Sequence, residues 1–196
     1  MVHRHPHILM VTALLALLAS ASVHAVPQLA YQVEATVGDV EVRRYAPHLL
    51  ASVQVDANFE AAGNRAFRPL FRFIDGNNSR GEEISMTAPV LQSAGTAGWE
   101  VSFVMPEGYR MDTLPRPEQQ EVQIRSASGE LMAALAYSGR WSESRYRLHE
   151  TALREALQTS EYQICGEPLW ARYDPPFKPW FMRRNEVLIP VAKGSC

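Results

Sequence analysis

The stretch that decides the fold is the last long run of the chain, Trp170-Ala171-Arg172-Tyr173-Asp174-Pro175-Pro176-Phe177-Lys178-Pro179-Trp180-Phe181-Met182-Arg183-Arg184-Asn185-Glu186-Val187-Leu188-Ile189-Pro190-Val191. Its two ends are rich in strand-forming residues, and a segment with three prolines and three aromatics separates them. Because proline fixes φ and interrupts strand pairing, this pattern predicts a terminal β-hairpin with a wide, stiffened tip. We expect the aromatic residues of the tip to form a rim.

Two helices are predicted upstream of this hairpin. Asn58 is a favourable N-cap for a helix from Phe59 to Ile74, and Ser142 begins a second helix that runs to about Thr159. In the first helix a helical projection separates three groups of residues: an apolar face with Phe59, Ala62, Ala66, Leu70, Phe73 and Ile74, a basic face with Arg65, Arg68 and Arg72, and an edge with Phe67 and Phe71.

The remaining segments read as strands. Alternating or β-rich patterns occupy Tyr31–Val42, Val40–Tyr45, Leu49–Val55, Ile84–Leu91, Trp99–Met105, Val122–Arg125 and Leu131–Tyr137. The last two of these are predicted to form a hairpin around Ser128-Gly129. The order strands, helix, hairpin therefore occurs twice, which predicts an α+β fold with two helices against a curved, mostly antiparallel sheet.

The first 25 residues have the pattern of a cleavable secretory signal. A short basic start precedes the apolar run Ile8–Leu18, and Val23-His24-Ala25 has small residues on both sides of a variable one. The run is too short to be a comfortable membrane span, and no cysteine follows it as a lipid anchor. We therefore expect a signal peptide at residues 1–25, one domain at residues 26–196, and a periplasmic or secreted protein without a stable membrane anchor.

Composition excludes several functional classes. The formal net charge is −2, so the bulk charge does not attract nucleic acid. After removal of the signal only His48 and His149 remain, which excludes a zinc site with three histidines. The chain contains no Gly-x-Ser-x-Gly elbow, no His-Glu-x-x-His and no phosphate loop, and we expect it not to be an enzyme.

The two cysteines, Cys165 and Cys196, form one disulfide or none. An oxidising compartment favours the bond, and closing the loop between them would stabilise the fold by roughly 3–4 kcal/mol in the chain-entropy description. The alternative is a buried Cys165 and a free thiol at a frayed C-terminus.

Three motifs in order identify a resemblance. They are Ile84-Ser85-Met86-Thr87-Ala88-Pro89-Val90, Phe103-Val104-Met105-Pro106, and Tyr-Asp-Pro-Pro-x-Lys-Pro followed by Arg-Arg-Asn-Glu between Tyr173 and Glu186. Together they resemble the SOUL haem-binding family, from about Tyr31 to Val191. The resemblance implies a distorted barrel made of two related halves and a groove beside the first helix that binds haem b or another porphyrin non-covalently.

The residues assigned to this groove fall into two groups. Apolar walls are expected from Phe67, Leu70 and Phe71 of the first helix and from the rim residues Phe177 and Trp180; Arg68, Arg72, Lys178 or Arg183 would face the propionates. The three helix residues are carried over by their position alone. The absence of Cys-x-x-Cys-His excludes covalent attachment of the c type.

Iron ligation is a separate question. The resemblance implies a histidine beside the tyrosine of the early strand, but this chain has Arg43-Arg44-Tyr45 there, and a guanidinium does not ligate iron. His48 is the nearest substitute, and its alternative role is that of an exposed turn histidine. His149 lies in the apolar stripe of the second helix, where we expect it to be a core residue.

The first hypothesis is therefore an exported tetrapyrrole-binding protein for haem carriage, scavenging or buffering, with an unknown haem donor or acceptor as its partner. The alternative is a ligand-sensing or protein-interaction module of the effector-binding type with no haem role. A basic groove favours anionic porphyrins, whereas an acidic pocket favours apolar cations. A purely structural envelope protein, without any small ligand, is a third hypothesis.

Overall fold

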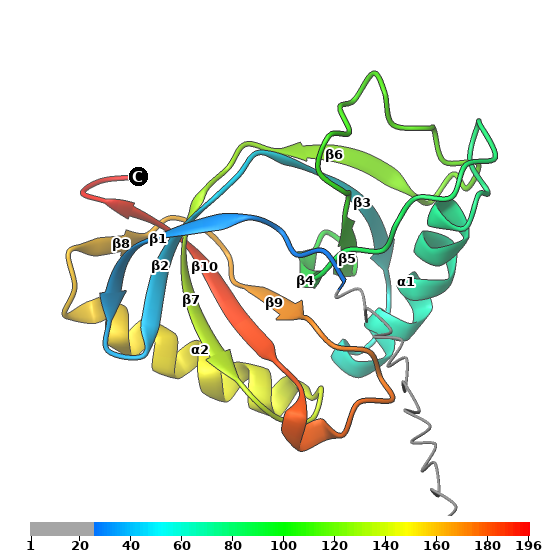
Figure 1. Ribbon diagram of the computed structural model, residues 1–196. Coiled ribbons are helices and arrows are strands. Elements are labelled where there is room, and N and C mark those ends of the chain that lie inside the picture. The colour runs from blue at the N-terminus through cyan, green and yellow to red at the C-terminus, as the bar shows by residue number, and fades with distance from the viewer. Residues whose placement is uncertain (1–25) are drawn as a thin grey trace, which may run out of the picture.

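A computed structural model describes residues 26–196, and the signal-peptide prediction lies outside these residues. The described chain is an α+β domain in which one open, strongly curved sheet carries two helices (Figure 1). The strands are β1 (Tyr31–Val37), β2 (Val40–Tyr45), β3 (His48–Val55), β4 (Val90–Gly95), β5 (Gly98–Val104), β6 (Gln123–Ala127), β7 (Leu131–Tyr137), β8 (Tyr162–Ile164), β9 (Leu169–Arg172) and β10 (Asn185–Lys193). Their order is β1-β2-β7-β10-β9-β4-β5-β3-β6, with β8 paired to β10, and all of these pairs are antiparallel.

Helix α1 (Phe59–Ile74) has the predicted bounds. The Asn58 side chain accepts a hydrogen bond of 2.8 Å from the Ala61 amide, which satisfies one of the free donors of the first turn. Its apolar face packs on β3 and β5, and Leu70 and Phe73 are fully buried there. The cap and the 3.6-residue period therefore define this helix.

Helix α2 (Glu143–Gln158) packs on β7 and β10. Its predicted N-cap, Ser142, makes no side-chain capping bond. Instead, the carboxylate of Glu60 in α1 accepts a hydrogen bond of 3.0 Å from the Glu143 amide. The beginnings of the two helices therefore lie together, although the helices belong to different halves of the sheet (Figure 1).

The sheet has an outer face covered by the helices and an inner face that lines a cavity. Side chains alternate between the two faces along each strand. Val187 and Ile189 of β10, for example, pack beneath α2, whereas Leu188 faces the cavity. Any strand residue can thus be assigned to the helix side or the cavity side.

Two strand predictions are wrong. Residues 122–137 do not form a hairpin, because β6 pairs with β3 while β7 pairs with β2 and β10. The chain crosses between the two halves of the sheet at Gly129, where an added Cβ would lie 2.8 Å from the Tyr45 carbonyl oxygen. Alternation identifies a strand but does not identify its partner.

The strand predicted for Ile84–Leu91 begins only at Val90. The residues before it are held from the side instead: the Thr87 hydroxyl donates to the Val104 carbonyl with a distance of 2.5 Å, and the Ala88 amide donates to the Pro27 carbonyl with 2.8 Å. This segment is therefore fixed by contacts with two other parts of the chain.

The terminal hairpin is confirmed. Asn185 of β10 pairs with Arg172 of β9, and the Tyr173 amide donates to the Arg184 carbonyl at 3.3 Å. The tip contains the short 3-10 helix η1 (Trp180–Met182). In the described part of the chain no helix is long and apolar enough to cross a membrane.

The C-terminal tail is attached to β8. Cys165 and Cys196 are disulfide-bonded, with their Cα atoms 5.5 Å apart and a sequence separation of 31. The Cys165 amide also donates to the Pro190 carbonyl at 2.8 Å. The bond therefore closes the end of β10 against the strand that precedes β9.

Candidate functional site

One edge of α1 carries aromatic side chains to the surface. Gly63, Phe67 and Phe71 follow each other at intervals of four residues and so share this edge. The rings of Phe67 and Phe71 are stacked, with centroids 5.7 Å apart and an interplanar angle of 13°, and each side chain is 43% exposed. Phe67 also packs edge-on against Phe103 of β5, at 5.5 Å. Leu70 is fully buried in the core beneath them.

A row of paired residues crosses the outer face of the sheet at this level. Phe103 pairs with Val90, Val90 with Arg172, Arg172 with Asn185, and Asn185 with Tyr137. Paired residues point to the same face, so Arg172 lies on the helix side of the sheet. The row connects the aromatic edge of α1 with the hairpin tip.

Arg172 fills the space that Gly63 leaves open. A Cβ added to Gly63 would lie 2.4 Å from one terminal nitrogen of the Arg172 guanidinium. That guanidinium stands 5.3 Å from the ring centre of Trp141 and 4.8 Å from that of Trp170. Burial lowers the pKa of Arg172 to about 10, because the charged form has lost water and has gained no carboxylate.

Trp141 is held between two arginines at the start of α2. Arg183 lies over its ring at 4.4 Å, and Arg172 lies at 5.3 Å. The indole nitrogen donates a hydrogen bond of 2.9 Å to the side-chain oxygen of Asn185, so the ring has a fixed position. The tip ring of Trp180 carries a further cation, Arg140, at 5.2 Å.

The hairpin tip presents the predicted rim aromatics to solvent. Phe177 is 87% exposed and Trp180 is 46% exposed. Lys178 forms an ion pair of 2.6 Å with Asp174, which also accepts a hydrogen bond from the Arg184 amide. Lys178 is therefore already paired within the tip, whereas the aromatic rings of Phe177 and Trp180 keep a large exposed fraction.

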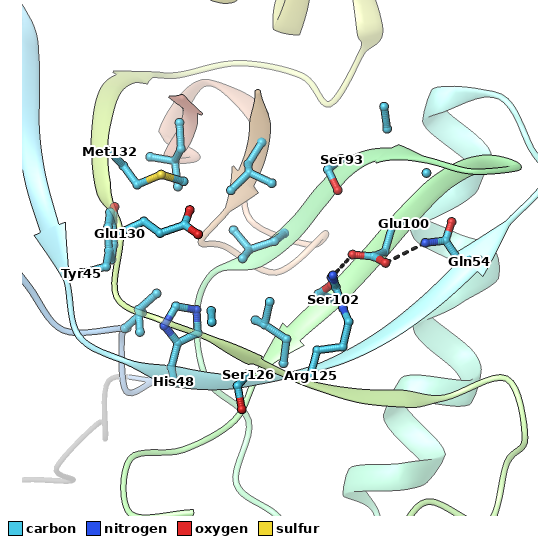
Figure 2. Close-up of a pocket in the computed structure, with 18 of the residues that line it drawn as sticks. Tyr45, His48, Gln54, Ser93, Glu100, Ser102, Arg125, Ser126, Glu130 and Met132 are labelled. Carbon is cyan, nitrogen blue, oxygen red and sulfur yellow. Dashed lines mark hydrogen bonds and ion pairs between the residues drawn. The ribbon is translucent and has the colours of Figure 1, made fainter. Parts of the chain in front are cut away.

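The inner face of the sheet lines a cavity of about 560 Å³ (Figure 2). Its apolar lining residues are Leu29, Leu50, Leu91, Met132, Leu169 and Leu188. Its polar lining includes Gln54, Glu100, Ser102 and Arg125; Glu100 pairs with Arg125 and accepts a hydrogen bond of 2.6 Å from Gln54. Glu130 also lines the cavity and makes no ion pair with the described residues. With its histidine neutral, the cavity carries a net negative charge.

His48 belongs to this cavity and not to the aromatic edge of α1. Its Nδ1 lies 2.8 Å from the Ala46 carbonyl oxygen, which makes Nδ1 the protonated nitrogen and leaves the lone pair on Nε2. The ring points into the cavity beside Tyr45 and Glu130 (Figure 2). The sheet therefore separates His48 from Phe67 and Phe71, which lie on its other face.

The other predicted residues lie as follows. Arg68 and Arg72 are exposed on the solvent side of α1, more than 90° around the helix from the core. His149 is half-buried, with its ring stacked on Tyr137 at 3.8 Å. Among residues 26–196 no group of three histidine, cysteine, aspartate or glutamate side chains is placed to hold a metal ion. The sequence does not indicate Trp141, Arg140 or Arg172 as site residues: the first two lie in the connection between β7 and α2, and a charged residue in a short strand such as β9 indicates solvent exposure.

Comparison with known families decides the relationship of the chain. The SOUL heme-binding protein profile matches residues 26–190, which is nearly the whole described domain. The chain belongs to the SOUL family. Among SOUL relatives, heme-binding protein 1 of Xenopus tropicalis is 29% identical over 75% of this chain and 80% of its own length. Heme-binding protein 1 of Mus musculus is 28% identical over 72% and 78%, and heme-binding protein 2 of Homo sapiens is 24% identical over 78% of each.

Solved structures extend the SOUL fold to more distant proteins. The C-terminal domain of EcmrR is similar with a TM-score of 0.60 and 11% identity, over 83% of this chain and 98% of that domain. A hydrolase from Listeria innocua has a TM-score of 0.53 and 11% identity, over 81% and 94%. At such identities the likeness concerns the fold alone, which is of the effector-binding type.

Proposed function

We propose that this protein binds haem or a related tetrapyrrole non-covalently on the aromatic surface formed by Phe67 and Phe71 of α1 and by Phe177 and Trp180 of the hairpin tip. Membership of the SOUL heme-binding family supports the ligand class. The observation that carries the location is the stacked, half-exposed pair Phe67–Phe71, because a flat macrocycle packs on such a surface without reorganising it.

The expected affinity follows from the area available. Covering on the order of 300 Å² of porphyrin at about 25 cal/mol/Å² gives roughly 7 kcal/mol before the cost of association. Such binding is micromolar at best. It depends on the macrocycle and its carboxylates, so we expect the protein to accept porphyrins with and without iron.

Neither of the two histidines considered as iron ligands, His48 and His149, lies on this aromatic surface. His48 faces the inner cavity, and His149 is stacked against Tyr137 beneath α2. We therefore propose a carrier, scavenger or buffer of tetrapyrroles that acts after export to the periplasm or the exterior, and not an enzyme or a redox haemoprotein. The signal-like sequence of residues 1–25 supports export.

A titration with haemin, followed by its Soret band, tests both the ligand and the location. We expect saturation near one equivalent, with affinity lowered about tenfold in Phe67→Ala and unchanged in His48→Ala and in the matched control His149→Ala. Loss of the Soret shift in His48→Ala alone would move the site to the inner cavity. Failure of haemin and protoporphyrin to saturate at tens of micromolar would end the tetrapyrrole proposal.

The inner cavity favours a second candidate function, the sensing of an apolar cation. Its apolar lining is combined with Glu130, which no described cation neutralises, and a hydrophobic pocket with a carboxylate suits a bulky quaternary ammonium ion. Titration with tetrabutylammonium tests this function. Saturable binding that Glu130→Gln weakens and Phe67→Ala leaves unchanged would establish a separate cation site, whereas no binding at millimolar concentration would exclude one for this probe.

A further inference from the structure

Three arginines gather at the end of the aromatic edge of α1, and we call Arg140, Arg172 and Arg183 the arginine cluster. Two of them enclose the ring of Trp141 at 5.3 and 4.4 Å, and the third lies over the ring of Trp180 at 5.2 Å. All three side chains come from segments that meet where the beginnings of α1 and α2 approach the hairpin tip (Figure 1). The cluster therefore concentrates positive charge beside the exposed aromatic rings.

The cluster makes no ion pair with any residue of the described chain. Arg183 donates only to neutral groups, the carbonyl oxygens of Lys178 and Pro176, and the Nε of Arg172 is buried without a hydrogen-bond acceptor. A desolvated guanidinium without a carboxylate is costly, and an anion that reaches it would relieve that cost.

The acidic side chains at the beginnings of α1 and α2 and in the hairpin tip already have partners of their own. Glu60 accepts from the Glu143 amide, Glu143 pairs with Arg147 at 3.4 Å, and Asp174 pairs with Lys178 at 2.6 Å. Arg145, in the first turn of α2, adds another cation whose only described acceptor is the Ser138 carbonyl. Positive charge at this end of the surface thus exceeds the negative charge available to balance it.

The position of Arg172 connects the cluster to the tetrapyrrole surface. Its guanidinium lies against Gly63, and Phe67 follows Gly63 by one turn on the same edge of α1. By contrast, Arg68 and Arg72 point to solvent on the far side of this helix. A planar ligand on Phe67 and Phe71 therefore has the arginine cluster at one end. Arg68 and Arg72 of α1 are exposed and are not comparable to the partly buried Arg172.

We propose that the arginine cluster is an anion site that binds the carboxylates of the tetrapyrrole and fixes which edge of the ring faces the hairpin tip. This inference rests on the proposed function. Arginine suits the task because its planar fork binds a carboxylate through two parallel hydrogen bonds, whereas the paired Lys178 offers a single ammonium group.

The experiment compares protoporphyrin with its dimethyl ester, which keeps the ring and lacks both negative charges. We expect the diacid to bind about tenfold more tightly, the scale of one charge-assisted hydrogen bond. Arg172→Gln and Arg183→Gln should each remove most of this preference and leave the affinity for the ester unchanged. Arg183→Lys keeps the charge without the fork and should retain part of the preference.

Arg68→Gln is the matched control, because it removes an exposed cation that follows Phe67 in sequence but points to solvent, and it should leave both affinities unchanged. Equal binding of diacid and ester to the unmodified protein would overturn the anion site while the proposed function stood. A preference that disappears in Arg68→Gln and persists in Arg172→Gln would also overturn it, because the carboxylates would then face the solvent side of α1. Failure of both ligands to bind would overturn the proposed function and this inference together. Unchanged near-UV circular dichroism would show that each variant is folded.

Discussion

Arg43 and Arg172 are withdrawn from water on opposite faces of the same sheet, and their surroundings differ completely. Arg43, on the inner face, has a side chain that is 4% exposed and donates two hydrogen bonds, of 2.7 and 3.1 Å, to the fully buried Glu186. Arg172, on the outer face, has aromatic rings and an amide for neighbours. The first arginine completes a closed ion pair, whereas the second has a charge that the described chain does not neutralise.

The inner pair is part of a larger network. The hydroxyl of Tyr173 donates to Glu186 at 2.7 Å, and Arg184 adds a bond of 2.7 Å to the other carboxylate oxygen. Burial alone would raise the pKa of Glu186, but the hydrogen bonds and charge of Arg43, with those of Tyr173 and Arg184, hold it below its ordinary value. Every charge in this network has a partner, so we interpret it as structural. The contrast predicts that mutations on the two faces have opposite profiles in stability and binding.

The largest expected effect is on stability, from Glu186→Gln. This change keeps the shape of the side chain and leaves the buried Arg43 with only the half-exposed Glu41, 2.7 Å away, as a counter-ion, so the free energy of unfolding should fall by about 3–5 kcal/mol. Urea unfolding measures the loss. The control is Glu34→Gln, which breaks the exposed pair with Arg44 and should cost less than about 1 kcal/mol. Similar losses of unfolding free energy in the two variants would show that the buried network stabilises the fold no more than an exposed ion pair does.

Acid should weaken the same network, by less than the mutation does. The folded-state pKa of Glu186 is depressed, so its stabilisation is present above the unfolded-state pKa and disappears as the pH falls through the folded-state pKa. The unmodified protein should therefore lose more unfolding free energy between pH 5 and pH 2 than Glu186→Gln loses. Urea unfolding across this range tests the difference, and parallel curves for the two proteins would contradict it.

On the outer face, Arg172→Met should change binding more than stability. The substitution removes a desolvated cation and strands no carboxylate, so the free energy of unfolding should change by less than about 1 kcal/mol. The affinity for protoporphyrin should fall about tenfold, and that for its dimethyl ester should not change. A loss of stability as large as that of Glu186→Gln would mean that Arg172 is a structural residue and that the contrast between the two faces is wrong.

The features that the sequence predicts well are those set by local chemistry. The bounds of α1 follow from the Asn58 cap and the helical period, and the final hairpin follows from the proline-rich segment between its strands. The pairing of β6 with β3 was not predictable in this way, since two strands joined by a glycine turn have the pattern of a hairpin whether or not they pair.

In the candidate site, too, the residues whose positions are set locally are predictable and those set by distant contacts are not. Phe67 and Phe71 at the edge of α1 are found by periodicity, because the helix itself determines their direction. The place of His48 in the cavity does not follow from the sequence, because it depends on which face of β3 lines the cavity, and a shift of one residue reverses that face. The environment of Arg172 is still harder to predict, because it depends on Gly63 of one helix and on Trp141 at the start of the other, which are far apart in sequence.

Gly63→Ala should have the smallest effect and gives the finest test of the outer face. Alanine favours the helix by up to about 1 kcal/mol, but its Cβ would lie 2.4 Å from the Arg172 guanidinium and must displace it. Because the displaced group is the far end of a flexible side chain, the helical gain and the cost of displacing it should nearly cancel in the free energy of unfolding. The affinity for protoporphyrin should fall two- to fivefold, because the guanidinium is misplaced and not removed. On a logarithmic scale this loss is roughly half of that in Arg172→Met. In the Arg172→Met background the obstacle is gone, so the same substitution should show the full stabilisation by alanine and no further loss of affinity. An identical effect of Gly63→Ala in both backgrounds would show that Arg172 does not depend on the space beside α1, and the anion site would then have to be formed by Arg140 and Arg183 alone.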